Sequence, residues 1–349
     1  EDEYGKLLSL FKGDIVGEQV PGSDWSDWSE PYADPQGSPI TSPSPREFLA
    51  LQATLLSDDP GVSPLLRSIR LNYSRPVAQS LLGEISPSQV DQLGVKRSFS
   101  YYVQPQFSSR DPGFDELLLV APSNMELDLV GLYGGRVVDF EDAAIDITRL
   151  ALENVEIVAT GRDSLHLRFD AITPSGSTRI LRLDFETALF LTGAILQASL
   201  RNSGDTEGGS WQRIDPGEAL QQIADNTTTI IASVESSLLL TQVEVHPQAF
   251  TPNGDGINEN TAFSFKVLRV GDNSPIEVTV YDLGGNRLRR IVEHRALSSG
   301  AYVIQWDGRN DAGDLVPPGL YCVRLSVDTD VEGTTVKDGT VFRTVAVAY

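Results

Sequence analysis

The stretch Pro275–Ile291, PIEVTVYDLGGNRLRRI, decides the fold class of this 349-residue chain. Its first half places β-branched apolar residues at every second position, which is the period of a strand with one buried face. The following Asp282-Leu283-Gly284-Gly285-Asn286 supplies the positive-φ positions of a tight hairpin turn. Leu288 and Ile291 then resume the strand pattern. The stretch therefore predicts a β-hairpin that packs one face against a core.

Three further blocks flank this hairpin: FTPNGDGINE at 250–259, GAYVIQWDGRNDAG at 300–313 and VPPGLYCVRLSV at 316–327. Each combines an alternating apolar run with a Gly, Asp, Asn or Pro turn. We expect Trp306 to lie in the core, and Tyr321 to begin the buried face of another strand. Five or more strands within about 100 residues describe a β-sandwich, here over residues 243–349.

The four blocks, in this order and spacing, closely resemble the FlgD-type immunoglobulin-like domain. That domain occurs in flagellar hook-capping proteins and at the C-terminus of secreted bacterial proteins, including cargo of type IX secretion and gliding systems. The resemblance implies an Ig-like sandwich. Its core and turn motif falls on Tyr281, Gly285, Trp306, Asp307, Gly308, Gly313, Gly319 and Tyr321. The last residues, Val345–Tyr349, depart from the basic tail usual for type IX cargo.

The N-terminal part is less regular. Residues 46–57, REFLALQATLLS, alternate so that Leu49, Leu51, Ala53 and Leu55 share one apolar face, which predicts a half-buried strand, with a short helix as the alternative. With Trp25 and Trp28, this region resembles discoidin-type, galactose-binding-like jelly rolls. The matching residues are Trp25, Trp28, Arg46, Leu51, Gln52, Leu55, Ser57, Pro64, Leu66, Ile69 and Tyr73. A whole jelly roll needs more chain, so we expect a partial domain over 1–95, or one completed by another segment.

Between these parts, residues 96–215 read as a second β-sandwich domain. Its expected strands are 98–103, 116–120, 127–132, 155–159, 164–169, 178–185 and 194–200. Residues 216–242 read as a connector, with one or two helical turns at 218–223 and strands at 227–231 and 238–245. The fold class predicted for the whole chain is all-β, with tandem β-sandwich domains of which the C-terminal one is Ig-like.

The charge and hydropathy of the chain limit the classes of partner and the cellular location that we expect. The chain holds 27 basic and 49 acidic residues, a net charge of −22, which disfavours nucleic acids and anionic membrane surfaces as partners. No apolar run approaches the roughly 18–20 residues of a membrane span. The sequence begins at Glu1 rather than Met. That start fits either a trimmed chain or a mature secreted product without its signal peptide, and we expect a secreted or cell-surface bacterial protein.

The residue types for catalysis are scarce. One cysteine, Cys322, and three histidines leave no multi-cysteine metal site, and no nucleophile or phosphate-loop motif occurs. Cys322 is expected to be partly exposed, and His166 to lie on a strand surface. With 49 acidic residues in the chain, neighbouring acids such as Asp115 and Glu116 are expected by chance and do not indicate a catalytic pair. The prediction is that this protein is not an enzyme.

One loop has the composition of a cation site. Asn253, Asp255, Asn258 and Glu259 place side-chain oxygens along a glycine-rich loop, as Ca²⁺ prefers. The EF-hand spacing is absent, so the favoured interpretation is an Asx-turn network that caps the first strand, with bound Ca²⁺ as the alternative. No other cofactor is expected.

Three functions remain. The favoured one is an extracellular structural or interaction protein that assembles with itself or with other surface proteins through strand edges and the C-terminal domain. The second is a carbohydrate-binding or adhesion module, in which Trp25 and Trp28 stack on sugar rings; the competing interpretation is that both cover a core edge. The third is a scaffold for flagellar hook assembly.

Overall fold

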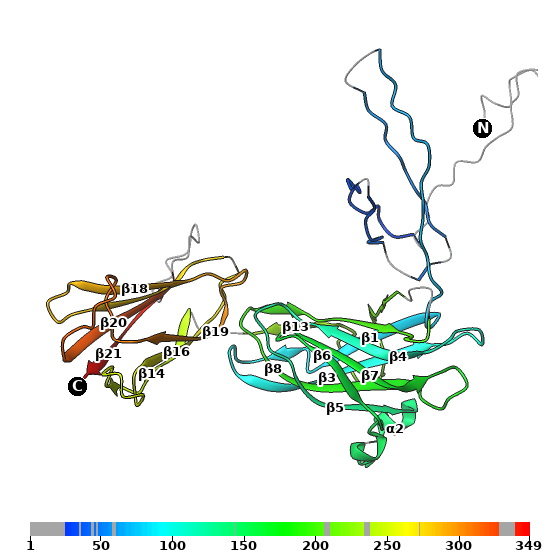
Figure 1. The fold of residues 1–349 in the computed structure, drawn as a ribbon. Helices are drawn as coiled ribbons and strands as arrows, with labels where there is room; N and C mark the ends of the chain where they lie inside the picture. The colour runs from blue at the N-terminus through cyan, green and yellow to red at the C-terminus, as the bar shows by residue number, and fades with distance from the viewer. Residues whose placement is uncertain are drawn as a thin grey trace, which may run out of the picture. The chain divides into compact units, whose positions relative to one another are not determined.

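The computed structural model describes residues 25–349, except 35, 43–44, 47, 58–60, 143, 206–209, 234–237, 272 and 328–338. The chain divides into two units, residues 1–64 and residues 65–349. The second unit holds every strand found among the described residues, and these form several sheets (Figure 1). Helical structure in the described part is limited to α2 (Val137–Glu141) and the 3-10 turn η2 (Ile147–Leu150). The predicted all-β fold class is confirmed.

The first sandwich has two five-stranded sheets, in the orders β12-β1-β3-β8-β5 and β11-β10-β4-β7-β6, and a small sheet β2-β13-β9. The strands are β1 (Ser80–Ser86), β2 (Gln89–Val90), β3 (Lys96–Gln106), β4 (Phe114–Val120), β5 (Asp128–Gly135), β6 (Glu156–Thr160), β7 (Ser164–Ile172), β8 (Ile180–Ala188), β9 (Gly193–Ile195), β10 (Gln197–Arg201), β11 (Gln212–Arg213), β12 (Asp215–Pro216) and β13 (Thr229–Ala232).

Period-2 alternation builds the core of this sandwich. On β3 and β8 every second residue is buried, and Phe99 lies opposite Phe185 with ring centroids 5.9 Å apart. The second sheet contributes Leu117 from β4 and Leu167 from β7, neither of which is exposed. Each strand therefore has a core face and an outward face, and the outward face is free to carry polar residues.

The sandwich takes in chain on both sides of the expected 96–215. Strand β1 pairs with β3 along its whole length, from Ser80 opposite Gln106 to Ser86 opposite Ser100, and it buries Leu81 and Ile85. Strand β13 comes from the expected connector and pairs with both β2 and β9. These pairings join distant parts of the chain. The local sequence of turns and strands does not indicate which distant strands will pair.

The expected helical turns at 218–223 are not formed. The segment runs as irregular turns, and the backbone N–H groups of Ala219 and Leu220 donate to the Glu84 carboxylate, at 2.9 and 2.6 Å. These two donors would be free at a helix N-terminus as well. Here a side chain of β1 binds them, and both residues are buried against the sheet.

The predicted strand or helix at 46–57 is also not formed among the described residues. These residues have no regular secondary structure, and Phe48, Leu51 and Leu56 are exposed. Alternation says which face of a strand would be buried. It does not provide the neighbouring strand that would bury it.

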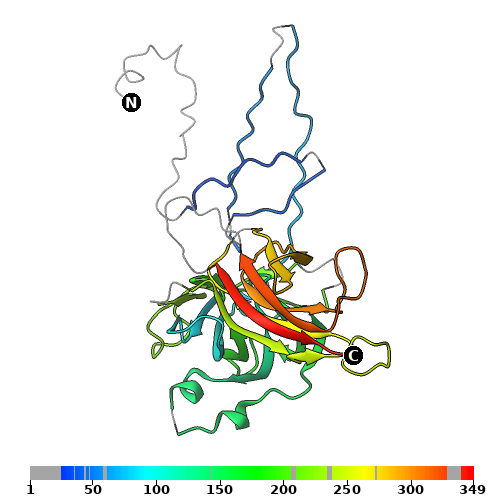
Figure 2. The ribbon, with the colours of Figure 1, turned by 90° about the vertical axis from the view of Figure 1, so that its left-hand side faces the viewer.

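The second sandwich packs a three-stranded sheet, β14-β16-β19, with a five-stranded one, β15-β21-β20-β17-β18. Figure 2 shows β21 in red beside β20 in orange. The bounds are β14 (Leu240–His246), β15 (Ala249–Phe250), β16 (Thr261–Val267), β17 (Ile276–Tyr281), β18 (Arg287–Glu293), β19 (Gly300–Trp306), β20 (Gly319–Val327) and β21 (Thr340–Val347). The predicted hairpin is β17 and β18, closed by hydrogen bonds between Asp282 and Asn286.

Candidate functional site

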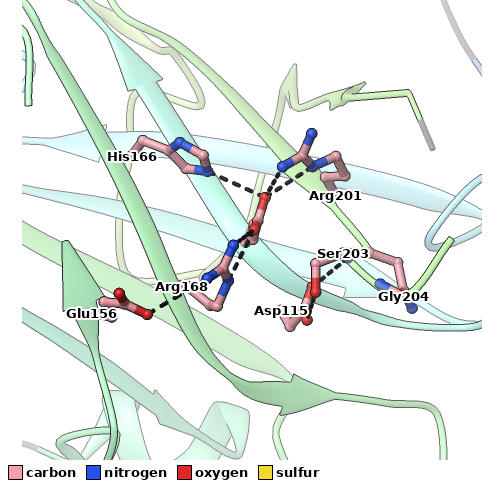
Figure 3. Close-up of polar contacts among 9 residues, drawn as sticks. Asp115, Glu156, His166, Arg168, Arg201, Ser203 and Gly204 are labelled. Atoms are coloured by element: carbon pink, nitrogen blue, oxygen red, sulfur yellow. Dashed lines mark hydrogen bonds and ion pairs between the residues drawn. The ribbon is translucent and has the colours of Figure 1, made fainter. Parts of the chain in front are cut away.

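A polar cluster lies on the outward face of the β4, β7 and β10 sheet, centred on Glu116. The Glu116 carboxylate accepts from Arg168 Nε and Nη2, at 3.0 and 2.7 Å, through Oε1. Its Oε2 accepts from Arg201, with Nε at 2.8 Å, and lies 3.2 Å from His166 Nε2. Figure 3 shows the three side chains meeting this carboxylate from two sides. The carboxylate thus has four guanidinium contacts and one imidazole contact.

Sheet register brings these residues together. Glu116 on β4 lies directly opposite Arg168 of β7 on one side and Arg201 of β10 on the other. His166 lies two residues before Arg168, on the same face of β7. Cross-strand neighbours have Cβ atoms about 4.5–5.5 Å apart, which suits side-chain hydrogen bonds. The cluster therefore ties three adjacent strands together.

The indole ring of Trp211 packs against two members of the cluster, Arg201 and His166. The Arg201 guanidinium carbon lies 4.6 Å from the centre of the indole ring, and the His166 ring meets the indole edge-on at 5.2 Å. The Glu116 side chain is 0% exposed, whereas those of Arg168 and Arg201 are 43% and 31% exposed. The anion is thus fully buried, and both arginine side chains are partly exposed to solvent.

Charge decides what this cluster can do. Burial alone would raise the pKa of Glu116, but the hydrogen bonds from Arg168, Arg201 and His166 outweigh it and hold that pKa below its usual range. A carboxylate held ionised in this way is a poor proton donor at neutral pH, and arginine does not titrate there. The arrangement can fix strands and balance a buried charge.

The sequence interpretation missed this cluster. It placed His166 on a strand surface, and the structure does place it on the outward face, but as part of a cluster. It treated Glu116 as one acid among many. Polar residues on the expected strands 116–120 and 164–169, and Arg201 directly after the expected strand 194–200, were visible. The order of those strands was not, so nothing indicated that the positions adjoin.

The predicted cation loop, Pro252–Glu259, is tied together by its own side chains. Asn253 Oδ1 accepts from the Asp255 N–H at 3.0 Å, and Asp255 Oδ1 accepts from the Ile257 N–H at 2.7 Å. Glu259 Oε1 accepts from the Gly256 N–H, and the Asn258 carbonyl accepts from the Thr251 N–H. Hydrogen bonds to Ile257 and Asn253 lower the pKa of Asp255. This is the Asx-turn network of the favoured interpretation, and calcium binding at these residues stays a prediction.

Within the described ranges, no three His, Cys, Asp or Glu side chains converge as metal ligands. Among the same residues, no helix has the length and apolar character needed to cross a bilayer. Cys322 is half-buried on β20.

The motif residues of the second sandwich surround Trp306. Its indole is 1% exposed, donates to the Arg309 carbonyl at 2.9 Å, and packs edge-on against Phe250 and Tyr321. The turn after it uses Asp307, whose carboxylate accepts from the Arg309 N–H, and Gly308 at φ +72°. Of the remaining motif residues, Gly285 and Gly313 have positive φ, Gly319 begins β20, Tyr281 ends β17, and the Tyr321 hydroxyl donates to the Pro317 carbonyl.

The predicted sugar-binding residues lie in the first unit. Trp25 is 38% exposed and Trp28 is 61% exposed, and neither belongs to a strand. The nearby Tyr32 hydroxyl accepts from the Thr41 N–H at 3.0 Å. Exposed indoles are available for stacking, and sugar binding here stays a prediction.

Residues 254–339 match the family model of the FlgD Ig-like domain. The C-terminal sandwich is thus of the FlgD type, as its motifs predict. No curated protein matches the chain.

Similar solved structures include two bacterial pilins and the protein PorU. A 35 kDa C-terminal fragment of the major pilin GBS80 of Streptococcus agalactiae is 8% identical, over 76% of this chain and 90% of that one, with a TM-score of 0.27. The major pilin subunit BcpA of Bacillus cereus is 8% identical over 77% and 66%, with a TM-score of 0.28. Dimeric latent PorU of Porphyromonas gingivalis is 14% identical over 81% and 21%, with a TM-score of 0.25. At such scores these likenesses carry no argument about function.

Proposed function

We propose that this chain is a non-enzymatic structural protein of the bacterial cell surface, which assembles with itself or with other surface proteins. The observation that carries the proposal is the FlgD-type sandwich placed after another β-sandwich. The polar cluster around Glu116 supports it, since its groups are used to hold strands together. The strongly acidic composition suits a protein that stays soluble outside the cell.

The test is the assembly state of the full chain. We expect sedimentation velocity to show larger species as concentration rises from about 1 to 100 μM, a range that reveals micromolar dissociation constants. Negative-stain microscopy of the concentrated sample should then show ordered polymers. A protein that stays monomeric over the whole range, and that cells release without retaining any on their surface, would contradict the proposal.

A second function, carbohydrate binding, is favoured by the exposure of Trp25 and Trp28. Indole rings stack on sugar faces, as in other aromatic platforms. A glycan array probed with the wild-type chain and with Trp25→Ala and Trp28→Ala decides this. Binding that survives both substitutions, or no binding at all, removes this candidate.

A further inference from the structure

The loop between β15 and β16 contains the one Asn-Gly pair of the sequence, Asn253-Gly254. Residues 253–258 are exposed, so water reaches this pair. The carboxamide of an asparagine is open to attack by the backbone nitrogen of the next residue. Glycine hinders this attack least, because it has no Cβ. The pair therefore has the residue types for a reaction that needs no enzyme.

Hydrogen bonds hold the Asn253 carboxamide across the Gly254 peptide. Asn253 Oδ1 accepts from the Asp255 N–H at 3.0 Å, and Asn253 Nδ2 donates to Asp255 Oδ2 at 3.0 Å. The first bond closes a ring that contains both Asn253 Cγ and the Gly254 nitrogen, so the two reacting atoms are held on one short circuit. The same bond polarises the carbonyl that is attacked, as a donor in an oxyanion hole does.

The surroundings of Gly254 leave room for the attack. Gly254 has φ +83°, and nothing lies within 4 Å of the position that a Cβ would occupy. Among the residues that the structure describes, none accepts a hydrogen bond from the Gly254 N–H. The attacking nitrogen is thus neither crowded nor tied to an acceptor.

Asn202 forms the same turn without these two advantages. Asn202 Oδ1 accepts from the Gly204 N–H at 2.9 Å. The next residue is Ser203, whose side chain crowds the backbone nitrogen, and the Ser203 N–H donates to Asp115 Oδ1 at 2.7 Å. Asn202 is therefore a matched internal reference, in which the turn is present and the attacking nitrogen is hindered.

We propose that Asn253 is a site of spontaneous deamidation in the folded protein. The Gly254 nitrogen attacks Asn253 Cγ. The N–Cγ bond forms, the Cγ–Nδ2 bond breaks, and ammonia leaves with the proton of the Gly254 N–H. Water then opens the cyclic imide at either carbonyl, which leaves aspartate or isoaspartate at position 253. This inference is independent of the proposed self-assembly.

Either product changes the loop. A carboxylate replaces the amide, so the hydrogen bond from Asn253 Nδ2 to Asp255 is lost and a second negative charge lies beside the first. Isoaspartate also lengthens the backbone by one carbon. Pro252, at the start of the loop, is buried next to the Gly308 turn. We therefore expect deamidation to loosen the loop and to weaken the packing of the second sandwich as the protein ages.

The first test follows the reaction by mass spectrometry in the full chain, kept folded at neutral pH. Cleavage after glutamate releases residues 245–259, which contain Asn253, and residues 187–207, which contain Asn202. We expect the first peptide to gain about one dalton over time, in two chromatographically distinct products. The second peptide should stay unchanged. The absence of a gain in residues 245–259, or an equal gain in residues 187–207, would overturn the proposal.

The second test asks whether the folded loop promotes the reaction or prevents it. A synthetic peptide with the sequence of residues 245–259 gives the rate for the same pair outside the fold. We expect the folded chain to react at least as fast as this peptide. A folded rate that is more than about tenfold slower, or about 1.4 kcal/mol in activation free energy, would show that the hydrogen bonds protect Asn253 and would contradict the inference.

Two variants test the roles of the two residues. Gly254→Ala adds a methyl group beside the attacking nitrogen, and we expect the rate to fall at least about tenfold. Asn253→Gln has a side chain too long to close the same ring, and residues 245–259 should then gain no mass. Circular dichroism confirms that both variants fold. An unchanged rate in either variant would exclude the proposed attack.

The structural consequence has its own readout. Asn253→Asp and aged wild-type protein should both unfold a few degrees below fresh wild type in thermal denaturation, since a small loss of stability shifts the midpoint of a domain of this size by about that much. A midpoint that stays the same in aged, fully deamidated protein would overturn the expected loosening of the loop.

Discussion

Glu116 is the residue on which the polar cluster of the first sandwich depends. Glu116→Gln leaves two guanidinium groups facing a neutral amide, and we expect a loss of about 2 kcal/mol of unfolding free energy at pH 7. This is below the roughly 3–5 kcal/mol typical of a buried pair broken on one side. The reason is that Arg168 and Arg201 are partly exposed and can turn to water. Urea denaturation measures the loss. The control, Glu156→Gln, removes an exposed acid 3.6 Å from Arg168 and should change stability by less than about 0.5 kcal/mol.

The pH dependence of that loss has a defined sign. The folded-state pKa of Glu116 lies below its usual value of 4.5. Its contribution is therefore complete above about pH 4.5 and is lost as the pH falls through the lowered folded-state pKa. The difference between wild type and Glu116→Gln should shrink when urea denaturation is repeated toward pH 3. A difference that is constant with pH would mean that the residue acts through packing alone.

Glu84 is the second buried glutamate, and its pKa moves in the opposite direction. Burial raises it, although the N–H groups of Leu220 and Ala219 oppose the shift, and Oε2 has no partner in the described structure. The raised folded-state pKa means that the carboxyl costs stability as the pH rises above its unfolded value. We expect Glu84→Gln to be more stable than wild type at pH 7 and equal to it near pH 4, by thermal denaturation. Glu153→Gln makes the same change of charge at an exposed site, and its stability relative to wild type should not vary with pH in this way. A Glu84→Gln variant that is less stable than wild type at pH 7 would contradict the prediction that the buried carboxylate costs stability.

At the scale of elements, the turn after β19 depends on Gly308. Gly308 has φ +72°, and a Cβ there would lie 2.8 Å from Pro252 Cγ, an atom of a rigid ring. We expect Gly308→Ala to cost about 2–3 kcal/mol, the sum of backbone strain and a contact that cannot relax. Gly313→Ala is the control, since φ is +90° there but nothing lies within 4 Å of a Cβ. It should cost about 1 kcal/mol. Equal losses in urea denaturation would show that the Pro252 contact is unimportant.

The loop Pro252–Glu259 gives a prediction about calcium. Its side-chain oxygens already accept backbone N–H groups. We therefore expect about 5 mM Ca²⁺ to leave the thermal midpoint unchanged. This concentration is roughly a hundredfold above the Kd of a site that binds Ca²⁺ with a Kd of about 50 μM. A real site of that affinity would add about 2.7 kcal/mol of stability. A rise that is absent in Asp255→Asn would establish the alternative interpretation, with calcium bound by this loop.

Local sequence predicted elements well where alternation and turn chemistry agree. The hairpin at 275–291 has a buried apolar face at Ile276, Val278 and Val280, and a Gly285 turn at φ +83°, as its residues indicate. Residues 46–57 have an equally clear alternation but no strand partner. A partner is a long-range property, which a period of two does not encode. The same limit explains why the pairing of β1 with β3, and of β13 with β2 and β9, does not follow from the residues of those strands alone.

At the scale of the whole molecule, the Glu116 cluster shows what sequence alone leaves open. Glu116, His166 and Arg168 were visible as polar residues on expected strands, and Arg201 directly follows the expected strand 194–200. The strand order β10-β4-β7 makes them neighbours, although Glu116 and Arg201 are 85 positions apart. The fold class and the C-terminal domain followed from local patterns. The polar cluster followed only from topology.

The two sandwiches have two distinct core clusters and share no strand pairing within the described residues, although Leu268, directly after β16, is buried in the first cluster. Chains built in this way unfold as more than one cooperative unit. We therefore expect calorimetry of the full chain to resolve two transitions. Glu116→Gln should lower the midpoint of one and Gly308→Ala that of the other, because the first acts on the sandwich of β4 and the second on that of β19. A shift of several degrees accompanies each kcal/mol in domains of this size. A single transition that both substitutions lower would show instead that the two sandwiches unfold as one cooperative unit.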